Sequence, residues 1–283
     1  MPFHKETYAY SITSSNKPFD FRFRDIWNFR DLLLLFVHRD FVAFYKQTIL
    51  GPLWFFIQPL LTTIVFTIIF GNIAKIPTDG LPPIMFYLAG VTSWQYFAEC
   101  FKKTANSFTL NASIFGKVYF PRVIVPLSVT ITNLIAFGIQ FLLFLVFLFY
   151  YKLNGSIVQP NIYIILFPLL ILMMGIMGLG FGMLVSAMTT KYRDLQFLVA
   201  FGVQLLMYAT PVIYPISSIP EKYHWIIMAN PMTSVIETFR YSFLGAGDLS
   251  WIGITYSFIF TIVIFLLGLI VFNRTEKNFM DTV

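Results

Sequence analysis

Long stretches without any charged side chain recur along this 283-residue chain. A helix rises about 1.5 Å per residue and the hydrocarbon core of a bilayer is about 30 Å thick, so roughly 20 apolar residues suffice for one crossing. The stretches are close to this length or longer, and the pattern therefore predicts membrane-spanning segments. The six stretches are residues 47–74, 80–98, 123–151, 153–190, 195–220 and 249–273.

The same stretches predict helices rather than barrel strands. Backbone polar groups in hydrocarbon must be satisfied within the protein, which leaves helices or closed barrels as spanning structures. Barrel strands would alternate apolar and polar residues over about 10 positions, and these runs do not alternate. We therefore predict an all-α integral membrane protein with a transmembrane domain over 53–272, preceded by a cytoplasmic N-terminal region, 1–52, and followed by a cytoplasmic tail, 273–283. The six spans are predicted near 53–73, 81–101, 124–150, 162–187, 195–214 and 252–272.

Composition and charge agree with this prediction and give the chain an orientation. Only 11% of the residues are charged and 58% are hydrophobic. With six crossings, 15 of the 19 Lys and Arg residues lie on one side, together with both termini. The positive-inside rule makes that side cytoplasmic. The net charge of +6 is explained by topology, so we expect no nucleic-acid partner, and the N-terminus MPFHKETYAY lacks the apolar region of a cleavable signal.

Three segments outside the predicted spans have a pattern of their own. Residues 19–46 mix Arg and Asp with Trp, Phe and Leu, which predicts an amphipathic helix in the membrane interface or, equally, a short helix packed on the protein's own cytoplasmic loops. The loop 102–123 contains a predicted helix from Ser107 to Phe115, a suitable docking element for a partner. The segment 211–250 is interrupted by four prolines and predicts a re-entrant hairpin or a cover over an outer opening.

The sequence contains no arrangement suited to catalysis, metal binding or ATP binding. The 13 acidic residues are scattered, and Glu237 and Arg240 are predicted to pair on one helix face. Gly116 and Lys117 lack the remainder of a phosphate-binding loop, and Cys100 is the only cysteine. We expect no catalytic, cofactor or metal residue. Because charged residues are essentially missing from the span interiors, energy for transport is expected from another subunit.

Two polar and aromatic stripes follow single faces of the first and fifth predicted spans. Polar residues in spans can hydrogen-bond neighbouring helices, and aromatic residues can fill volume toward lipid. Alternatively, aromatic faces stack on sugar rings while Gln, Thr and Tyr exchange hydrogen bonds with hydroxyl groups, as the wall of a conduit would require. The first stripe is Trp54, Gln58, Thr62 and Phe66; the second is Phe197, Phe201, Gln204 and Tyr208.

The fourth predicted span carries three closely spaced glycines. Gly175, Gly178 and Gly182 put small residues on adjoining faces, and GLGFG contains a GxxxG spacing. Small residues let helix backbones approach closely, so we predict tight helix packing here.

Several motifs occur in one order along most of the chain: LGPLWFFIQPL at 50–60, VFTIIFG at 65–71, KVYFPRVIVPLS at 117–128, KYRDLQ at 191–196, TPVIYP at 210–215 and NPMTSVIETFRYSFLG at 230–245. In this set the chain resembles the membrane subunit of ATP-binding-cassette exporters of bacterial polysaccharides. These are the permeases for O-antigen, capsule and teichoic acid. The resemblance implies a C2 dimer of permeases in the cytoplasmic (inner) membrane, two nucleotide-binding ATPase subunits that carry ATP and Mg, and a lipid-linked polysaccharide as substrate.

The resemblance also implies roles for segments. A coupling helix within 103–118 is expected to dock on the ATPase, residues 19–46 resemble an interfacial gate helix, and 215–247 a pair of outer gate helices. The first and fifth spans are then expected to form the conduit. On this basis Ser113→Arg and Phe115→Asp should uncouple transport and leave the fold intact. The expected coupling residues are Ser107, Phe108, Asn111, Ser113, Ile114, Phe115 and Lys117, and the expected outer-gate residues are Tyr214, Pro215, Glu237 and Arg240.

Alternatives remain open at this point. The motifs do not separate O-antigen from capsule or teichoic acid, nor from related exporters of lipids or drugs. A membrane channel and a membrane-embedded acyl- or glycosyltransferase are rivals of a different class. A partner ATPase encoded beside this chain would distinguish an exporter from both.

Overall fold

The computed structural model describes residues 23–46, 48–115, 117–118, 120–192 and 194–278. These residues form eleven α-helices joined by short 3-10 and π-helical segments. Residues 19–22 of the predicted interfacial segment, Gly116 after the predicted docking helix, and residues 279–283 of the tail lie outside the described residues. The helices are α1 (Phe23–Asn28), α2 (Arg30–Tyr45), α3 (Trp54–Phe66), α4 (Pro83–Ala105), α5 (Ser107–Phe115), α6 (Ile124–Leu153), α7 (Phe167–Lys191), α8 (Leu195–Tyr208), α9 (Glu221–Met228), α10 (Pro231–Leu244) and α11 (Trp251–Asn278).

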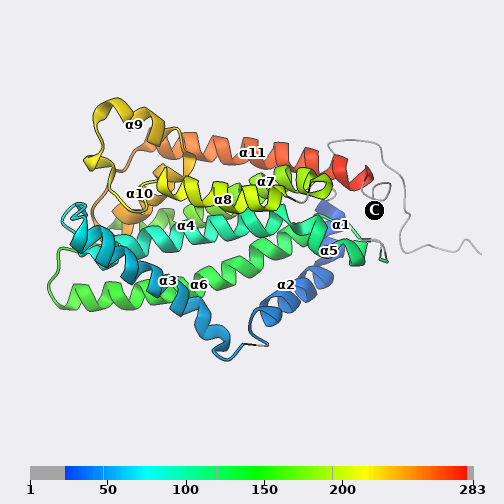
Figure 1. The fold of residues 1–283 in the computed structure, drawn as a ribbon, viewed down its shortest axis with the longest axis horizontal. Coiled ribbons are helices and arrows are strands. Elements are labelled where there is room, and N and C mark those ends of the chain that lie inside the picture. Colours follow the sequence, from blue (N-terminus) through cyan, green and yellow to red (C-terminus); the bar gives the residue numbers. More distant parts are fainter. Residues whose placement is uncertain (1–22, 47, 116, 119, 193, 279–283) are drawn as a thin grey trace, which may run out of the picture.

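The long helices run side by side along the long axis of the molecule, and the short helices gather at its two ends (Figure 1). Helices α1, α2 and α5 lie at one end, together with the C-terminal end of α11. Helices α9 and α10 lie at the other end. We call these the α5 end and the α10 end. The segments that the sequence analysis assigned to one side of a membrane therefore share one end of the molecule.

Among the described residues, four helical segments are long and apolar enough to cross a membrane: Gly51–Ile73, Ile124–Leu153, Ile162–Thr189 and Trp251–Thr275. The first of these joins α3 to a π-helical segment, Thr67–Ile73. Four of the six predicted spans are therefore long apolar helices in the structure. The second, α4, runs between the others but is less apolar, and the fifth, α8, has only 14 residues.

The polar content of α4 has a structural reason. Most of the helix is buried by other helices rather than left for lipid, including Thr92 and Ser93. The Ser93 hydroxyl donates to the carbonyl oxygen of Ala89 one turn earlier, so its polar atom is satisfied within the helix. A helix enclosed by protein does not need an apolar surface on every side, so hydropathy alone underestimates it.

Helix α8 is shorter than the sequence analysis predicted. It ends at Tyr208, whereas the predicted span continues to residue 214. Pro211 has no backbone N–H to donate, and it disfavours the helical conformation of Thr210 before it. The boundary prediction was wrong because the apolar run continues past the point at which the backbone stops being helical.

Helices α4, α7 and α11 pack closely through glycine. A Cβ added at Gly178 of α7 would lie 2.7 Å from the carbonyl oxygen of Phe97 on α4, and one at Gly182 would collide with Thr104. On another face of α7, Gly180 meets Gly268 of α11. The predicted tight packing of the GLGFG segment is confirmed.

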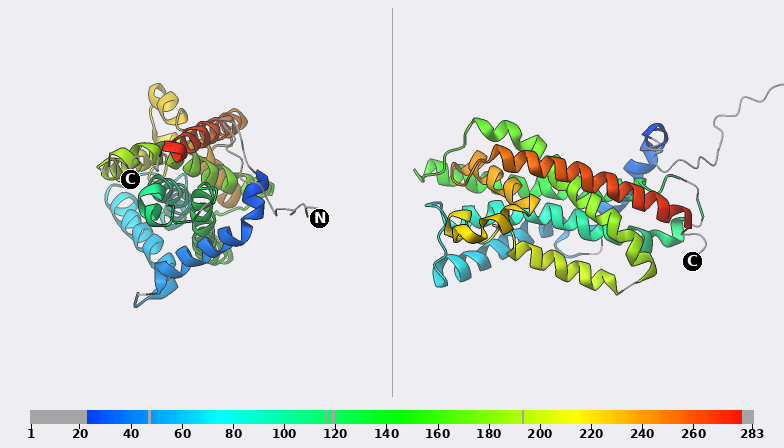
Figure 2. Two further views of the ribbon diagram at one scale, coloured as in Figure 1. Left: turned by 90° about the vertical axis from the view of Figure 1, so that its right-hand side faces the viewer. Right: turned by 90° about the horizontal axis from the view of Figure 1, so that it is seen from above.

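Helix α2 lies across the α5 end of the molecule (Figure 2, left). Phe36 and Val37 on its inner side are buried, and Phe36 belongs to an apolar cluster that includes Phe108 of α5 and Phe272 of α11. Leu34 and Leu35 on its outer side are exposed. The helix therefore packs on other helices of the chain, mainly α6, and leaves apolar residues exposed on its outer side.

Helix α10 is defined by its ends and buried along most of its length. Pro231 occupies its first position, and the side chain of Asn230 accepts a hydrogen bond from the backbone N–H of Met232. Gly245 ends the helix in the left-handed conformation, with φ of 78°. With α9, it forms the helix pair predicted between the fifth and sixth spans.

Candidate functional site

The first candidate stripe runs along α3 and changes environment along its length. Trp54 and Gln58 are exposed, whereas Thr62 and Phe66 are half-buried. The Thr62 hydroxyl donates to the carbonyl oxygen of Gln58 at 2.9 Å, and the Phe66 ring packs edge-on against Tyr87 of α4. The half of this stripe nearer the α10 end is therefore partly used in packing.

The second candidate stripe, on α8, faces away from the other helices of the chain. Phe197 is 80% exposed and Phe201 is 59% exposed; Gln204 and Tyr208 are exposed as well. Within α8 only Val203 is buried. An exposed row of aromatic rings interrupted by an amide is available to a second subunit, to lipid or to a substrate.

The helices that carry the two stripes lie on the same side of the molecule, where both pack against α4 (Figure 2, left). They pack much less against each other than against α4. The structure therefore brings the stripes to one side of the molecule without joining them directly.

Helix α5 has the bounds that the sequence predicted, Ser107–Phe115. Ser113 is exposed, as is Lys117 just beyond the helix. Leu110 is 73% exposed, and the sequence analysis did not select it. Its position three residues before Ser113 puts both on one helix face, so helical periodicity could have found it. An exposed leucine and an exposed serine thus share one surface at the α5 end.

The remaining candidate coupling residues support that surface from below. Ser107, Phe108, Asn111 and Phe115 are buried, and Ile114 is half-buried. Phe108 stacks on Phe272 of α11, with ring centroids 4.5 Å apart, and Phe115 packs against Phe120. The expectation that Phe115→Asp leaves the fold intact is therefore wrong, because the substitution places a carboxylate inside an apolar cluster.

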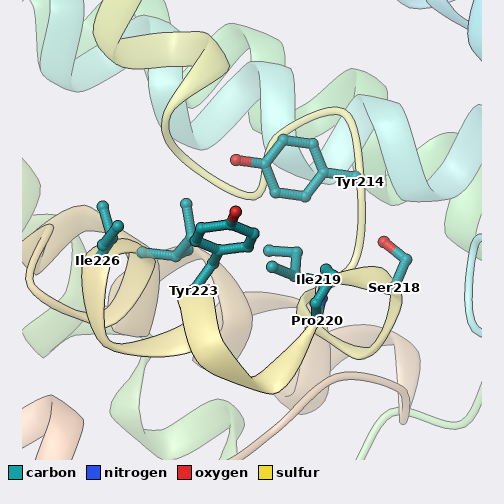
Figure 3. Close-up of a pocket in the computed structure, with 7 residues that line it drawn as sticks. Tyr214, Ser218, Ile219, Pro220, Tyr223 and Ile226 are labelled. Carbon is teal, nitrogen blue, oxygen red and sulfur yellow. The ribbon is translucent and has the colours of Figure 1, made fainter.

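The outer-gate candidates divide into two groups at the α10 end. Tyr214 faces Tyr223 of α9 across a cavity of about 460 Å³, which Ser218, Ile219, Pro220, Ile226 and Ile227 also line (Figure 3). Burial raises the pKa of the Tyr214 phenol. That phenol donates a hydrogen bond to the carbonyl oxygen of Tyr208 at 2.9 Å, so the cavity adjoins the Tyr208 end of the α8 stripe. Pro215 is buried beside it.

Glu237 and Arg240 form the predicted pair, with Oε1 and Nη1 3.2 Å apart. Both side chains are almost completely buried, and neither lines the cavity beside Tyr214. Burial raises the pKa of the Glu237 carboxyl and lowers that of the Arg240 guanidinium, while their mutual attraction opposes both shifts. The spacing predicted the pair, but the sequence carried no signal that this helix face is enclosed.

Comparisons with known proteins agree on one family. The ABC-2 type transporter family matches residues 31–244. An O-antigen export system permease protein, RfbA, from Klebsiella pneumoniae is 31% identical over 255 residues, which cover 89% of this chain and 94% of that protein. RfbA from Myxococcus xanthus is 30% identical over 77% of this chain and 82% of its own length. The polysialic acid transport protein KpsM from Escherichia coli is 21% identical over 82% of this chain and 89% of its own length.

Proposed function

The chain belongs to the ABC-2 type transporter family, as a membrane subunit, and we propose that it is the permease of an exporter that moves a lipid-linked O-antigen or capsular polysaccharide across the inner membrane. The observation that carries the proposal is similarity to O-antigen export permeases over nearly the whole length of both chains. Similarity to polysialic acid transport proteins and to a capsule polysaccharide export protein is lower, at 20–22% identity, which favours O-antigen over capsule.

The permease has no ATPase site of its own, and subunits of this family lack the ATPase domain. Transport by this chain therefore depends on a nucleotide-binding partner that holds ATP and Mg. We place the docking site of that partner on Leu110 and Ser113 of α5. The aromatic cluster beneath α5 connects this surface to α11 through the Phe108 and Phe272 stack, so movement of the partner reaches the long helices.

In the proposed membrane arrangement the chain crosses six times, with α4 and α8 added to the four long apolar helices. The α5 end lies in the cytoplasm with both termini, and the α10 end lies outside. The cation distribution supports this orientation, because most of the described Lys and Arg residues belong to segments at the α5 end. The enclosed position of α4 supports its crossing despite its polar residues.

The proposed conduit forms where two protomers meet across their α3 and α8 helices. The exposure of Phe197 and Phe201 supports this, since a single protomer leaves them uncovered. A lipid-linked glycan carries many hydroxyl groups, each expensive to place in hydrocarbon unless protein replaces water. Aromatic faces with interspersed Gln and Tyr supply stacking and hydrogen bonds without a charged relay. ATP would act by favouring one of two rigid arrangements of the dimer.

Deleting the gene in its own cell tests this function. We expect the glycan to disappear from the cell surface and its lipid-linked form to accumulate inside the cell. Reintroducing this chain should restore export only when its partner ATPase is active. A teichoic acid, lipid or drug exporter would leave the surface O-antigen and capsule unchanged. A channel or a transferase would not need the ATPase for rescue.

A further inference from the structure

Arg240 of α10 is the largest fully buried side chain of the described residues, and it binds backbone that belongs to another segment. Its Nη1 donates to the carbonyl oxygen of Pro211 at 2.5 Å, and its Nη2 donates to that of Val212 at 2.7 Å. The guanidinium carbon lies 3.7 Å from the centre of the Phe86 ring on α4. The planar fork of one arginine therefore holds two consecutive carbonyl groups just beyond the end of α8.

Glu237, one turn earlier on α10, extends this arrangement to a third segment. Its Oε1 pairs with Arg240, and its Oε2 accepts a longer hydrogen bond, 3.4 Å, from the backbone N–H of Asp248. Gly247 packs against the same carboxylate, because an added Cβ would lie 2.9 Å from Oε2. The pair thus links the residues after α8 and the residues before α11 to α10.

A contribution to stability alone does not explain this choice of residues. Replacing a buried ion pair by well-packed apolar residues of similar volume is often neutral or stabilising. What apolar residues cannot do is donate two parallel hydrogen bonds to neighbouring carbonyl groups, and lysine cannot do so with a planar fork. Pro211 and Val212 lie beyond the last turn of α8, so their carbonyl oxygens have no helical partner there.

Helix α8 and the segment that follows it are held differently within the chain. After the end of the helix, Thr210, Val212 and Ile213 are buried although they lie outside any helix, and Tyr214 bonds back to Tyr208. The helix itself is mostly exposed, from Phe197 and Phe201 near the α5 end to Gln204 and Tyr208. A helix that is anchored at one end and otherwise held by few contacts within its own chain can pivot about the anchored end.

We propose that Arg240 is a positioning residue that fixes the outer end of α8 to α10 and α4, so that α8 pivots there while its inner half moves during transport. This inference rests on the proposed function, because it assigns the motion to the conduit wall. Arg240 itself does not contact the glycan. It keeps Gln204 and Tyr208 at a constant distance from α4, and Gly90 of α4 leaves the space that the guanidinium needs: a Cβ there would lie 2.6 Å from Nη2.

Hydrogen exchange of the complete permease and ATPase complex tests the anchor without any variant. The amides of Thr210, Val212 and Ile213 should be as protected as those of α10, and the amides of 195–201 should exchange faster. Fast exchange at 210–213 in the native complex would overturn the proposal. This readout does not depend on which glycan is exported, so its failure is distinguishable from failure of the proposed function.

Arg240→Lys then tests the fork, because it keeps the positive charge and its partner Glu237 while losing one of the two carbonyl bonds. We expect hydrogen exchange at 210–213 to accelerate by about tenfold or more, because the variant loses one hydrogen bond from a charged group. We also expect fewer glycans to be exported per ATP hydrolysed. Gly90→Ala, which displaces the same fork from α4, should have the same two effects. If one of these two variants does not fold or accumulate in the membrane, the other still tests the proposal.

Two matched controls separate positioning from general weakening. Ser257→Ala removes a buried hydrogen bond, 2.7 Å, from α11 to the carbonyl oxygen of Pro231 in α10, and does not touch the end of α8. Gly138→Ala adds a methyl group to α6 where no atom lies within 4 Å. Both should leave export per ATP unchanged. Equal loss in Ser257→Ala and Arg240→Lys, or unchanged exchange at 210–213 in Arg240→Lys, contradicts a positioning role.

Discussion

Arg39 of α2 donates a hydrogen bond from Nη2 to Oδ1 of Asn111 on α5, across 3.2 Å. The same guanidinium lies over the Phe36 ring and pairs with Asp40. Asn111 is in turn fixed by its own Nδ2, which donates to the carbonyl oxygen of Ser107. The helix that lies across the α5 end is thus joined to the proposed docking helix by a polar contact as well as by apolar packing.

This contact predicts that α2 and α5 act together. Asn111→Leu removes the acceptor and Arg39→Gln removes the charged donor; each should reduce export per ATP, and the double variant should be little worse than either. A coupling energy of about 1 kcal/mol is expected, because Arg39 is partly exposed. Independent, additive losses in a double-mutant cycle of export rates would show that the two helices are not coupled here.

The exposed face of α5 predicts a second result. Leu110→Asp and Ser113→Arg should prevent stable docking of the ATPase and stop export without reducing the amount of folded permease. Ser113→Ala is the control and should behave as the native chain. The measurement is co-purification of the ATPase with the permease, together with ATP hydrolysis, which the isolated permease should lack. Normal docking in both charged variants would place the coupling surface elsewhere.

Phe115 provides a contrast on the same helix. Because its ring is buried against Phe108 and Phe120, Phe115→Asp should lose about 3 kcal/mol or more of folding free energy and lower permease abundance. Thermal unfolding of the purified complex would measure this. A fully abundant, equally stable Phe115→Asp permease would contradict the packing described for the α5 end.

The α8 stripe predicts graded losses of transport. Phe201→Leu or Tyr208→Leu alone removes ring stacking worth about 0.5–1.5 kcal/mol per contact, a change of about two- to tenfold in rate, and the double variant should be severely slow. Phe149→Leu is a suitable control, since Phe149 is an exposed ring on α6 outside both stripes. The readout is surface glycan per folded permease. Loss only in proportion to abundance would mean that the rings serve packing or lipid contact.

The proposed orientation predicts where tags become accessible. Tags at Met1 and Val283 should both be cytoplasmic, and a tag between Lys222 and Trp225 of α9 should be external. Cleavage of each tag by added protease, compared between intact spheroplasts and inverted vesicles, measures which side of the membrane the tag is on. If the tag at α9 were protected from protease in spheroplasts, the α10 end would face the cytoplasm, which contradicts the proposed orientation.

Local sequence signals predicted the parts of this fold that depend on local interactions. The bounds of α5 followed from a short helix-compatible segment that precedes Gly116, and the packing of α7 followed from the spacing of its glycines. The Glu237 and Arg240 pair followed from its i, i+3 spacing, because residues at that spacing share a helix face.

The features that were missed depend on distant contacts. The enclosure of Arg240 requires carbonyl groups nearly thirty positions earlier, which no periodicity reveals. The end of α8 at Tyr208 is an exception, because Pro211 is a local signal for it; the prediction followed the run without charged residues, which continues to residue 220. Helix α4 is enclosed by other helices and carries buried polar residues such as Ser93, and hydropathy along the chain cannot distinguish a helix surrounded by helices from one that faces lipid.

Translocation by the purified permease and ATPase complex in proteoliposomes tests the central claim most directly. Lipid-linked O-antigen on the outer leaflet, on the side of the ATPase, should move into the lumen and become protected from an added glycosidase when ATP is supplied. It should not move without ATP, or when the permease carries Leu110→Asp. Absence of ATP-dependent protection, or passage of glycan or ions without ATP, would contradict the account of this chain as an export permease.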